Sequence, residues 1–336
     1  MAKKKKATLK EIGEWGLIDW VQKNMPVNAS GLVKGIGDDA AVLIGGEIIT
    51  SDMLVERVHF DLKWQDLTKL GRKAMAVNLS DIAGMGGFAR CAFLNIAAPP
   101  RMGWNEVEQV LTGFSQACRE YGVAVAGGDT CASPGPLIIS VTVVGNTPRP
   151  VMRSGARPGD LVFVTGTLGD AALALKLFHK SKGKSLPGGQ NFNVLQANLL
   201  DPKPRMKLGR AVGQYASSMI DLSDGLAADI AHICRESSVG VKIKMENLPL
   251  SEEYKFIKGR LKEKGANKLY DEALYGGEDY ELLFTLSSNM VENIFRINTN
   301  TDITEIGEIT EAAQGMLIEG PGGEIELDPS KGYKHF

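Results

Sequence analysis

The chain has 336 residues, of which 43% are hydrophobic and 23% are charged. This composition is typical of a globular protein with an ample core, and the length suits two ordinary domains or one large one. The formal net charge of −2 gives no sign of a protein that binds nucleic acid or a membrane surface.

No apolar run reaches the roughly 18 residues that a membrane span needs. The one basic cluster, Lys3 to Lys6, has no further basic or aromatic support, so we expect a solvated tail. Four cysteines lie far apart without a C-x-x-C pair, which argues against zinc and disulfide frameworks. We therefore expect a cytoplasmic protein that binds neither nucleic acid nor a membrane.

The first half of the chain alternates strand and helix patterns. Short apolar strands are expected over 40–44 and 47–50, and helical spacing follows over 67–83. The remaining elements expected here are strands 91–97, 123–126 and 137–145 and a helix over 106–121. This half is α/β or α+β.

The clearest break in composition comes at Thr147–Pro150 and Gly155–Gly159, which are rich in proline and glycine. We place a domain boundary near residue 148, giving domains 1–148 and 149–336. The second domain is expected to contain strand 161–165, helix 171–179, a surface loop over 181–193, helices 206–215 and 225–237, and strands 241–245, 280–285 and 303–309. The tripeptide LSD occurs in both halves, a weak sign of similar construction.

The stretch GIGDDA, Gly35 to Ala40, is close to the glycine fingerprint of a dinucleotide-binding fold. That fold needs a helix directly after the glycines, whereas a strand pattern follows here. Two aspartates also stand where pyrophosphate oxygens would lie. The Rossmann interpretation is therefore rejected.

Several other acidic motifs share this setting of Gly, Ser, Thr and apolar residues. They are TSD (Thr50–Asp52), LSD (Leu79–Asp81), GGDT (Gly127–Thr130), DLSDG (Asp221–Gly225) and GGEDYE (Gly276–Glu281). Any one of them could be a turn or a helix N-cap, with Ser80 or Asp81 and Ser223 or Asp224 as the caps. Asp52 and Asp221 instead end apolar strands. So many coincidences favour a shared site.

If these carboxylates lie close together, part of their negative charge must be neutralised. Two unit charges about 4 Å apart repel by about 4 kcal/mol at an effective dielectric near 20. Oxygen ligands without His or Cys suit Mg²⁺, which binds through a few carboxylates, water and substrate phosphates. The sequence therefore predicts metals that hold phosphate, helped by backbone N–H groups at Gly127 and Gly128 and by Arg153.

Taken in order, these motifs resemble the thiamine-monophosphate kinase family, within the superfamily of aminoimidazole ribonucleotide synthetase. The resemblance runs from GEWGLI (Gly13–Ile18) through GIGDDAAV, TSDMLVERVHF, AVNLSDIAGMGG, AGGDT, MRSGARPGD, DLSDGL and GGEDYEL to GYKHF. It implies two α/β domains, the first pairing its sheet across a homodimer. It also implies transfer of phosphate from ATP to thiamine monophosphate, with several Mg²⁺ ions.

The resemblance assigns site residues by motif position. The implied metal ligands are Asp39, Thr50, Ser51, Asp52, Asp81, Asp129, Asp221 and Asp224. The implied ATP contacts are Gly128, Asp129, Arg153 and Ser223, and the implied contacts with thiamine phosphate are His59, Glu278 and Tyr333.

Each substrate residue keeps an alternative interpretation. His59 is as well explained by a structural role, Glu278 by a turn, and Tyr333 by simple packing of a terminal aromatic. If functional, Glu278 would face the cationic thiamine. Three departures from the family pattern also matter: Arg57 stands where Gly is common, Lys334 where an acidic residue is common, and Tyr333 is one of several aromatics seen at its position.

The chemistry implied needs no general base, because the acceptor phosphate is mostly dianionic at pH 7. Catalysis then depends on positioning and on neutralising charge, and we expect direct in-line transfer without a phosphoenzyme. The alternatives are the ATP-dependent cyclo-ligase of purine synthesis and a non-catalytic Mg–nucleotide-binding protein. Selenophosphate synthetase is disfavoured because Cys91 is the first cysteine, and the hydrogenase maturation relative because no cysteine tail follows GYKHF.

Overall fold

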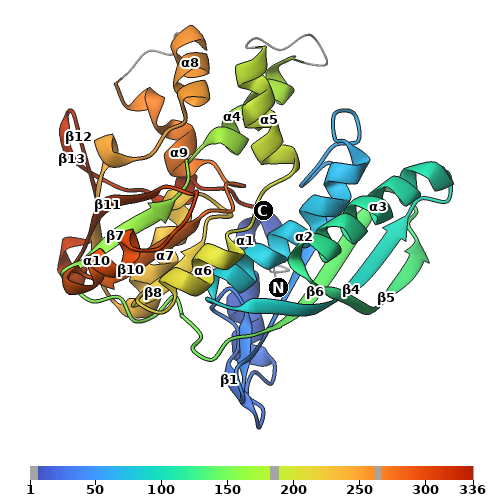
Figure 1. The fold of residues 1–336 in the computed structure, drawn as a ribbon, viewed down its shortest axis with the longest axis horizontal. Coiled ribbons are helices and arrows are strands. Elements are labelled where there is room, and N and C mark those ends of the chain that lie inside the picture. Colours follow the sequence, from blue (N-terminus) through green and yellow to red (C-terminus); the bar gives the residue numbers. More distant parts are fainter. Residues whose placement is uncertain (1–6, 182–188, 262–265, 336) are drawn as a thin grey trace, which may run out of the picture.

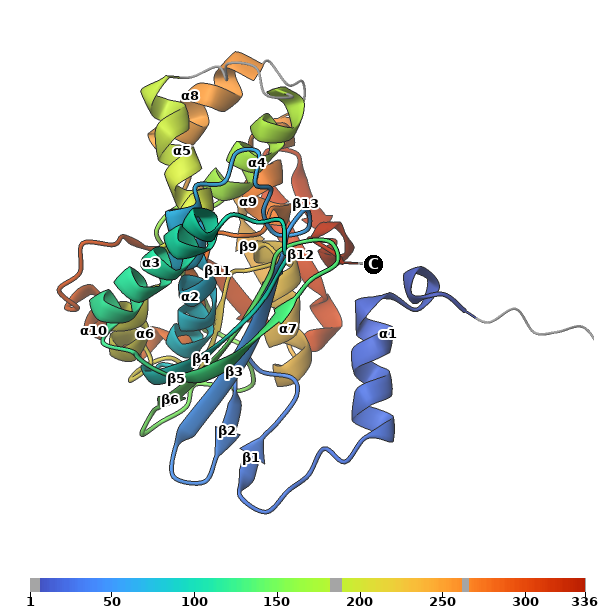
Figure 2. The same cartoon turned by 90° about the vertical axis from the view of Figure 1, so that its right-hand side faces the viewer.

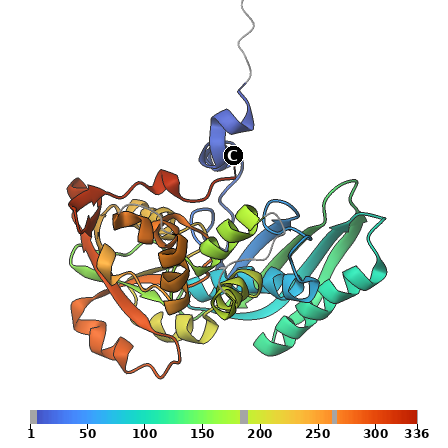
Figure 3. The ribbon, with the colours of Figure 1, turned by 90° about the horizontal axis from the view of Figure 1, so that it is seen from above.

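The computed structural model describes residues 7–181, 189–261 and 266–335. Two lobes lie side by side, each built on its own sheet, and the view from above shows the contact between them (Figures 1 and 3). The predicted tail Lys3–Lys6 lies outside the described residues. Within the described part of the chain, every helix is too short or too polar to cross a membrane.

The N-terminal lobe contains a six-stranded sheet in the order β1-β2-β3-β6-β4-β5. Its elements are β1 (Leu32–Lys34), β2 (Ala41–Leu43), β3 (Glu47–Val55), α2 (Leu67–Gly84), β4 (Phe88–Ala98), α3 (Trp104–Tyr121), β5 (Ala124–Ala132) and β6 (Ile138–Asn146). Helices α2 and α3 pack together over the sheet (Figure 1). The central strand β6 alternates buried and half-buried residues, as a sheet with one covered face requires.

The C-terminal lobe contains a seven-stranded sheet in the order β13-β12-β9-β11-β7-β10-β8. Its strands are β7 (Asp160–Thr165), β8 (Ser218–Asp221), β9 (Gly240–Lys244), β10 (Leu282–Ser287), β11 (Ile303–Thr310), β12 (Met316–Gly320) and β13 (Gly323–Glu326). Its helices are α4 (Asp170–Ser181), α5 (Gln190–Leu200), α6 (Met206–Val212), α7 (Leu226–Ser237), α8 (Glu252–Leu261), α9 (Asp271–Tyr275) and α10 (Val291–Phe295).

Helix α2 belongs to both lobes. Its side chains are buried along almost its whole length, including the polar Lys73 and Asn78, because it lies between the first sheet and the second lobe. Near its C-terminal end, Ala83 joins a hydrophobic cluster with Phe163 of β7 and Met219 of β8. A helix buried on all sides is an interior element of the molecule.

Several elements differ from the sequence expectations. Helix α1 (Leu9–Asn24) was not expected, and α5 begins at Gln190, within the segment predicted as a loop. Residues 182–188 of that predicted loop lie outside the described residues. Strand β3 continues past Asp52 to Val55, and β5 continues past the GGDT glycines to Ala132. Sheet pairing extended these strands through polar residues that a local pattern marks as strand ends.

The expected helix caps were also wrong. Asp81 lies inside α2, whose N-cap is Asp66, the acceptor of the Lys69 backbone N–H at 2.8 Å. The N-cap of α7 is Gly225 with φ 106° and no side-chain cap. Instead, Asp229 in the first turn accepts backbone N–H groups of residues 224 and 225, so Ser223 and Asp224 are not used as caps.

Candidate active site

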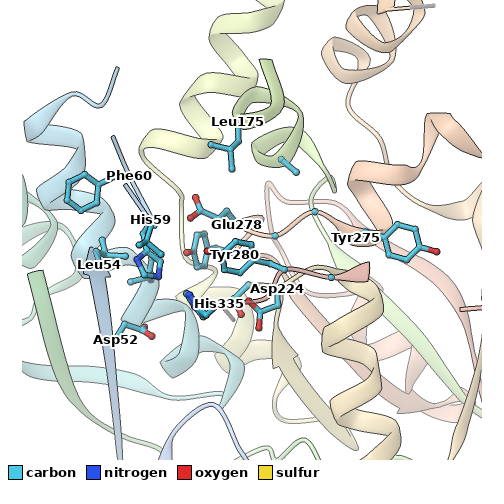
Figure 4. A pocket seen from close by; sticks show the side chains of 18 of the residues that line it. Asp52, Leu54, His59, Phe60, Leu175, Asp224, Tyr275, Glu278, Tyr280 and His335 are labelled. Atoms are coloured by element: carbon cyan, nitrogen blue, oxygen red, sulfur yellow. The ribbon is translucent and has the colours of Figure 1, made fainter. Parts of the chain in front are cut away.

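One cavity of about 790 Å³ lies at the junction of the lobes, and both lobes contribute to its walls. Figure 4 shows Asp52 and His59 on one side and Asp224, Glu278 and Tyr280 on the other. The predicted site residues that line it are Asp52, His59, Asp81, Asp221, Ser223, Asp224, Glu278 and Tyr333. Residues predicted to bind metal and residues predicted to bind substrate therefore share one cavity.

The acidic end of the cavity is built where three buried elements meet. Asp52 projects from β3, Asp81 from the last turn of α2 and Asp221 from the end of β8. Thr50, on the same face of β3 as Asp52, donates its hydroxyl hydrogen bond to Asp81 Oδ2. The backbone N–H of Asp52 donates to Asn78 Oδ1 at 3.1 Å, which ties β3 to α2.

Burial gives these acids an unusual protonation behaviour. It raises the pKa of Asp52 to about 6, and the charges of Asp224 and Asp39 add to the rise. Burial likewise raises the pKa of Asp81 and of Asp221 well above the ordinary range, and the neighbouring carboxylates raise both further. Such shifts mean that the protein alone does not stabilise all of these carboxylates in their charged form.

Arg153 supplies part of the missing positive charge. Its Nε and Nη2 atoms lie 2.8 and 2.7 Å from Asp39 Oδ1, and its backbone N–H donates to Asp38 Oδ1 at 3.0 Å. Burial nevertheless raises the pKa of Asp38 to about 6, with the charge of Asp39 as a second cause. The predicted ATP contact and the predicted metal ligand are thus directly paired.

The oxygen donors of this cluster fit Mg²⁺ that takes further ligands from elsewhere. Within the described residues, no three His, Cys, Asp or Glu side chains are arranged to hold a metal ion by themselves. Yet Asp221 Oδ2 is buried without a hydrogen-bond partner in the described part of the chain, as is Asp38 Oδ2, which faces Lys34 Nζ at 3.8 Å. Carboxylates with unused lone pairs suit an ion that keeps water and phosphate oxygens in its shell.

The structure does not bring three of the predicted site residues to this acidic cluster. Ser51 points to the opposite face of β3 from Thr50, and its hydroxyl lies 2.9 Å from Thr142 Oγ1. Gly128 and Asp129 lie on β5, which forms the edge of the sheet and is exposed along its whole length. In the sheet register Asp129 is three strands from Met53, about 14 Å by ordinary strand spacing.

The other end of the cavity is aromatic. The His59 ring lies 5.2 Å from the His335 ring, and Tyr333 meets His335 edge-on at 5.0 Å. His59 Nδ1 accepts the Val55 backbone N–H at 3.0 Å. Burial lowers the pKa of His59 to about 4, and positive charge at His335 and Lys73 lowers it further, so the ring is neutral at pH 7.

Sequence reasoning missed three residues at this end: Lys73, Tyr280 and His335. Tyr280 is buried, has φ 50° and lines the cavity beside Glu278 (Figure 4). Lys73 is 1% exposed and forms an ion pair with Glu278. Its position one turn before Val77, on the helix face predicted to be buried, was the available signal.

Comparison with known proteins agrees with this geometry. Residues 37–147 match the family described as AIR synthase related protein, N-terminal domain, and residues 157–318 match its C-terminal domain. The thiamine-monophosphate kinase of Aquifex aeolicus is 38% identical over 331 residues, which are 98% of this chain and 99% of the relative. The chain belongs to the thiamine-monophosphate kinase family.

Other thiamine-monophosphate kinases also match this chain. Those of Bacillus subtilis and Escherichia coli K12 are 32% and 35% identical, over 92% and 90% of this chain and 95% and 91% of theirs. A solved structure described as AaThiL complexed with AMPPCP and TMP has a TM-score of 0.85 at 36% identity, covering 98% of this chain and 99% of that one. The hydrogenase maturation protein HypE with ATP, at 16% identity and a TM-score of 0.68, shares the fold alone.

The structure explains one departure from the thiamine-monophosphate kinase pattern. Arg57, where the family commonly has Gly, adopts φ 69°, a left-handed conformation that favours glycine. The turn is closed by the Arg57 backbone N–H, which donates to Phe60 O at 2.6 Å. The same turn places His59 against Val55.

Proposed function

We propose that this protein transfers the terminal phosphoryl group of ATP to thiamine monophosphate, giving ADP and thiamine diphosphate. The observation that carries the proposal is the single cavity in which an acidic end meets an aromatic end. Membership of the family and a similar structure that contains AMPPCP and TMP support the same assignment.

The acidic end serves phosphate chemistry. Asp39, Asp52, Asp81, Asp221 and Asp224 are the residues that would hold Mg²⁺. When bound, Mg²⁺ neutralises charge on the two phosphate groups that must approach each other. Thr50 orients Asp81, and Arg153 fixes Asp39, so these carboxylates keep their positions before any ligand arrives.

The acceptor needs no protein base. A phosphate monoester is mostly dianionic at pH 7, because its second pKa is about 6. The described residues of the acidic end include no histidine, and the His59 ring belongs to the aromatic end. Positioning of the two phosphates in line is therefore the protein's main contribution, and the transfer is direct.

The aromatic end would hold the thiamine rings. His59 is neutral, so it does not repel a cationic thiazolium, and Tyr333 and His335 offer ring surfaces. Glu278 already has a cationic partner in Lys73, so opposite charge alone is not its role. Ring stacking and hydrogen bonding then select the substrate.

A second copy of the chain would complete the site. Every residue of β5 is exposed, and this edge strand carries Gly128 and Asp129, which the single chain leaves apart from the other acids. Pairing of N-terminal sheets across a homodimer covers this edge, as the resemblance implies. We place the reaction in the cytoplasm, in keeping with four free cysteines.

The test is product analysis with Mg-ATP and thiamine monophosphate, beside a formylglycinamidine ribonucleotide control. Thiamine diphosphate formed at one per ADP supports the kinase. Turnover of the control alone overturns the proposal in favour of the purine cyclo-ligase. Asp81→Asn should keep the fold and lose turnover, and normal turnover in this variant contradicts the metal assignment.

A further inference from the structure

Lys73 on α2 is an unusual residue for its surroundings. It is 1% exposed in a stretch whose other side chains are mostly apolar, and a buried ammonium group is costly unless it is paired. Its Nζ donates to the Leu199 carbonyl oxygen at 3.1 Å and to Glu278 Oε2. The lysine therefore joins α2 to the end of α5 and to the loop before β10.

Glu278 is held in the cavity wall by its backbone and by this side-chain contact. Its backbone has φ 73°, a left-handed conformation rare for glutamate, and its N–H donates to Ser223 O at 2.8 Å. Its side chain is 20% exposed toward the cavity. Oε2 is occupied by Lys73, whereas Oε1 has no hydrogen-bond partner among the described residues.

The pair also limits the negative charge that Glu278 itself offers to a ligand. The Lys73 ammonium and the Glu278 carboxylate cancel formally, and the neighbouring His59 ring is uncharged at neutral pH. A carboxylate already paired with an ammonium group attracts a second cation less strongly than an unpaired carboxylate would. A carboxylate held at one oxygen instead presents the other as a fixed hydrogen-bond acceptor.

We propose that Lys73 is a positioning residue that holds Glu278 so that its free Oε1 accepts a hydrogen bond from the amino group of the substrate's aminopyrimidine ring. This inference rests on the proposed function. It assigns ring specificity to a pair of residues that are 205 positions apart in the sequence. Lys73 contacts Glu278 rather than substrate, so it acts through another residue.

The test is calorimetric binding of thiamine monophosphate and of its analogue lacking the pyrimidine amino group, with Mg²⁺ and a non-hydrolysable ATP analogue present. The wild-type protein should prefer thiamine monophosphate by about tenfold, the worth of one hydrogen bond to a charged group. Lys73→Met should lower that preference to near one, with affinity for the ATP analogue changed by less than about twofold. Lys73→Arg should recover part of the preference.

Lys258→Met is the matched control. Lys258 is also a buried lysine, 5% exposed, and its Nζ lies 2.6 Å from Glu272 Oε2, but neither residue lines the cavity. This variant should keep the wild-type preference even if it loses thermal stability. Loss of preference in both variants would mean a general structural effect and would overturn the inference.

A double variant separates positioning from independent action. Because Lys73 acts through Glu278, Lys73→Met with Glu278→Gln should bind thiamine monophosphate no more weakly than Glu278→Gln alone. If the losses of affinity from the two substitutions multiplied in the double variant, Lys73 would not act through Glu278. An unchanged preference in Lys73→Met defeats only the inference, whereas wild-type protein that neither binds nor phosphorylates thiamine monophosphate defeats the proposed function itself.

Discussion

At the scale of single residues, the cavity brings together carboxylates whose charged forms destabilise the folded protein. Asp221 is buried, Asp52 and Asp81 are half-buried, and each has a raised pKa. Replacing such a carboxylate by a neutral group relieves the folded protein of repulsion and desolvation, yet removes a ligand. Activity and stability are therefore opposed at these positions.

We predict that Asp52→Asn stabilises the metal-free protein while abolishing turnover. The pKa of Asp52 rises from 3.8 to about 6 on folding, so its charged form destabilises the fold above pH 6. The gain in the free energy of unfolding should be about 1–2 kcal/mol at pH 7.5, below the limit that the shift sets. It should shrink as the pH falls from 6 toward 3.8 and vanish below that value, where the carboxyl is protonated in both states.

Denaturant titrations at pH 7.5 and pH 4.5 in chelator measure this prediction. A wild-type protein more stable than the variant at pH 7.5 would show that the charge of Asp52 is compensated in the folded state. Added Mg²⁺ with an ATP analogue should reverse the order, because only the wild-type carboxylate gains a ligand.

The sequence revealed the clustered aspartates but not Lys73 and His335, for a physical reason. Asp52, Asp81, Asp221 and Asp224 lie in motifs of Gly, Ser and Asp that stand out locally, and the structure brings them into one cavity. Lys73 and His335 act through contacts with residues far away in the chain. Nothing in their immediate neighbours reveals such a contact.

At the scale of elements, helix α1 is held by very little. Figure 2 shows it standing apart from both sheets, and none of its side chains is buried. Its main attachment is Trp15, whose ring lies 4.8 Å from the His232 ring and 4.6 Å from the Arg235 guanidinium carbon. Glu14 beside it lines the cavity, just after the backbone interruption at Gly13 with φ 70°.

We predict that Trp15→Ala frees α1 without unfolding the protein. The lost stacking and cation–π contacts are worth about 1 kcal/mol, so kcat/KM should fall by about fivefold if α1 holds Glu14 in place. Hydrogen exchange in residues 9–24 should accelerate, with the melting temperature nearly unchanged. Trp104→Ala, at a ring 69% exposed on α3, is the control. Equal kinetics in both variants would argue against a role for α1.

The end of α2 requires a glycine. A Cβ atom on Gly84 would overlap Asp39 Oδ2 and lie 3.1 Å from the Asp221 backbone nitrogen. We predict that Gly84→Ala displaces Asp39, lowers stability by about 1–3 kcal/mol and weakens binding of Mg-ATP. Thermal unfolding and calorimetry measure the two effects.

Gly259→Ala provides the comparison. This glycine also lies in a helix, but no atom stands within 4 Å of the added carbon. The change should stabilise α8 slightly, because alanine favours helix. A Gly84→Ala protein that behaves like this control would show that the acids tolerate the displacement.

Most long elements were predictable, whereas helix α1 and the strands β12 and β13 were not. The patterns of α2, α3, β6 and β7 followed burial of one face or of a central strand, and these elements were found close to their expected bounds. Helix α1 was missed because its apolar residues remain exposed, so it shows no periodic buried face. The strands β12 and β13 are short and partly exposed, which leaves little pattern to read.

At the scale of the whole molecule, the two-domain α/β architecture predicted from the motifs is confirmed. The boundary near residue 148 and the pairing of N-terminal sheets stay predictions. Edge strands with long exposed faces are usually covered or blocked, and β5 carries the exposed Val125. A second copy of the chain is the partner that we expect there.

We predict that wild-type protein is dimeric at micromolar concentration and that Val125→Lys is monomeric. Val125 is 55% exposed in the single chain, so a lysine at this position should leave the fold intact. Its charge should prevent the edge strand from pairing with another sheet. Turnover should fall together with dimerisation, because Asp129 would no longer reach a neighbouring site. Sedimentation velocity checks the mass.

Val194→Lys, on α5 and 41% exposed, serves as the matched surface change and should remain dimeric and active. A fully active wild-type monomer would refute the shared site.

The segment Pro329–His335 gives the molecule a vulnerability that its thermal stability would not reveal. The hydrophobic core ends at Leu327, whereas Tyr333 and His335 form cavity wall and are held by few contacts, among them the Tyr333 backbone N–H to Asp224 O at 3.2 Å. A single proteolytic cut after Leu327 would remove this wall without opening either core. A preparation can then age into inactivity while its melting curve stays that of fresh protein, so intact mass is the safer measure of sample quality.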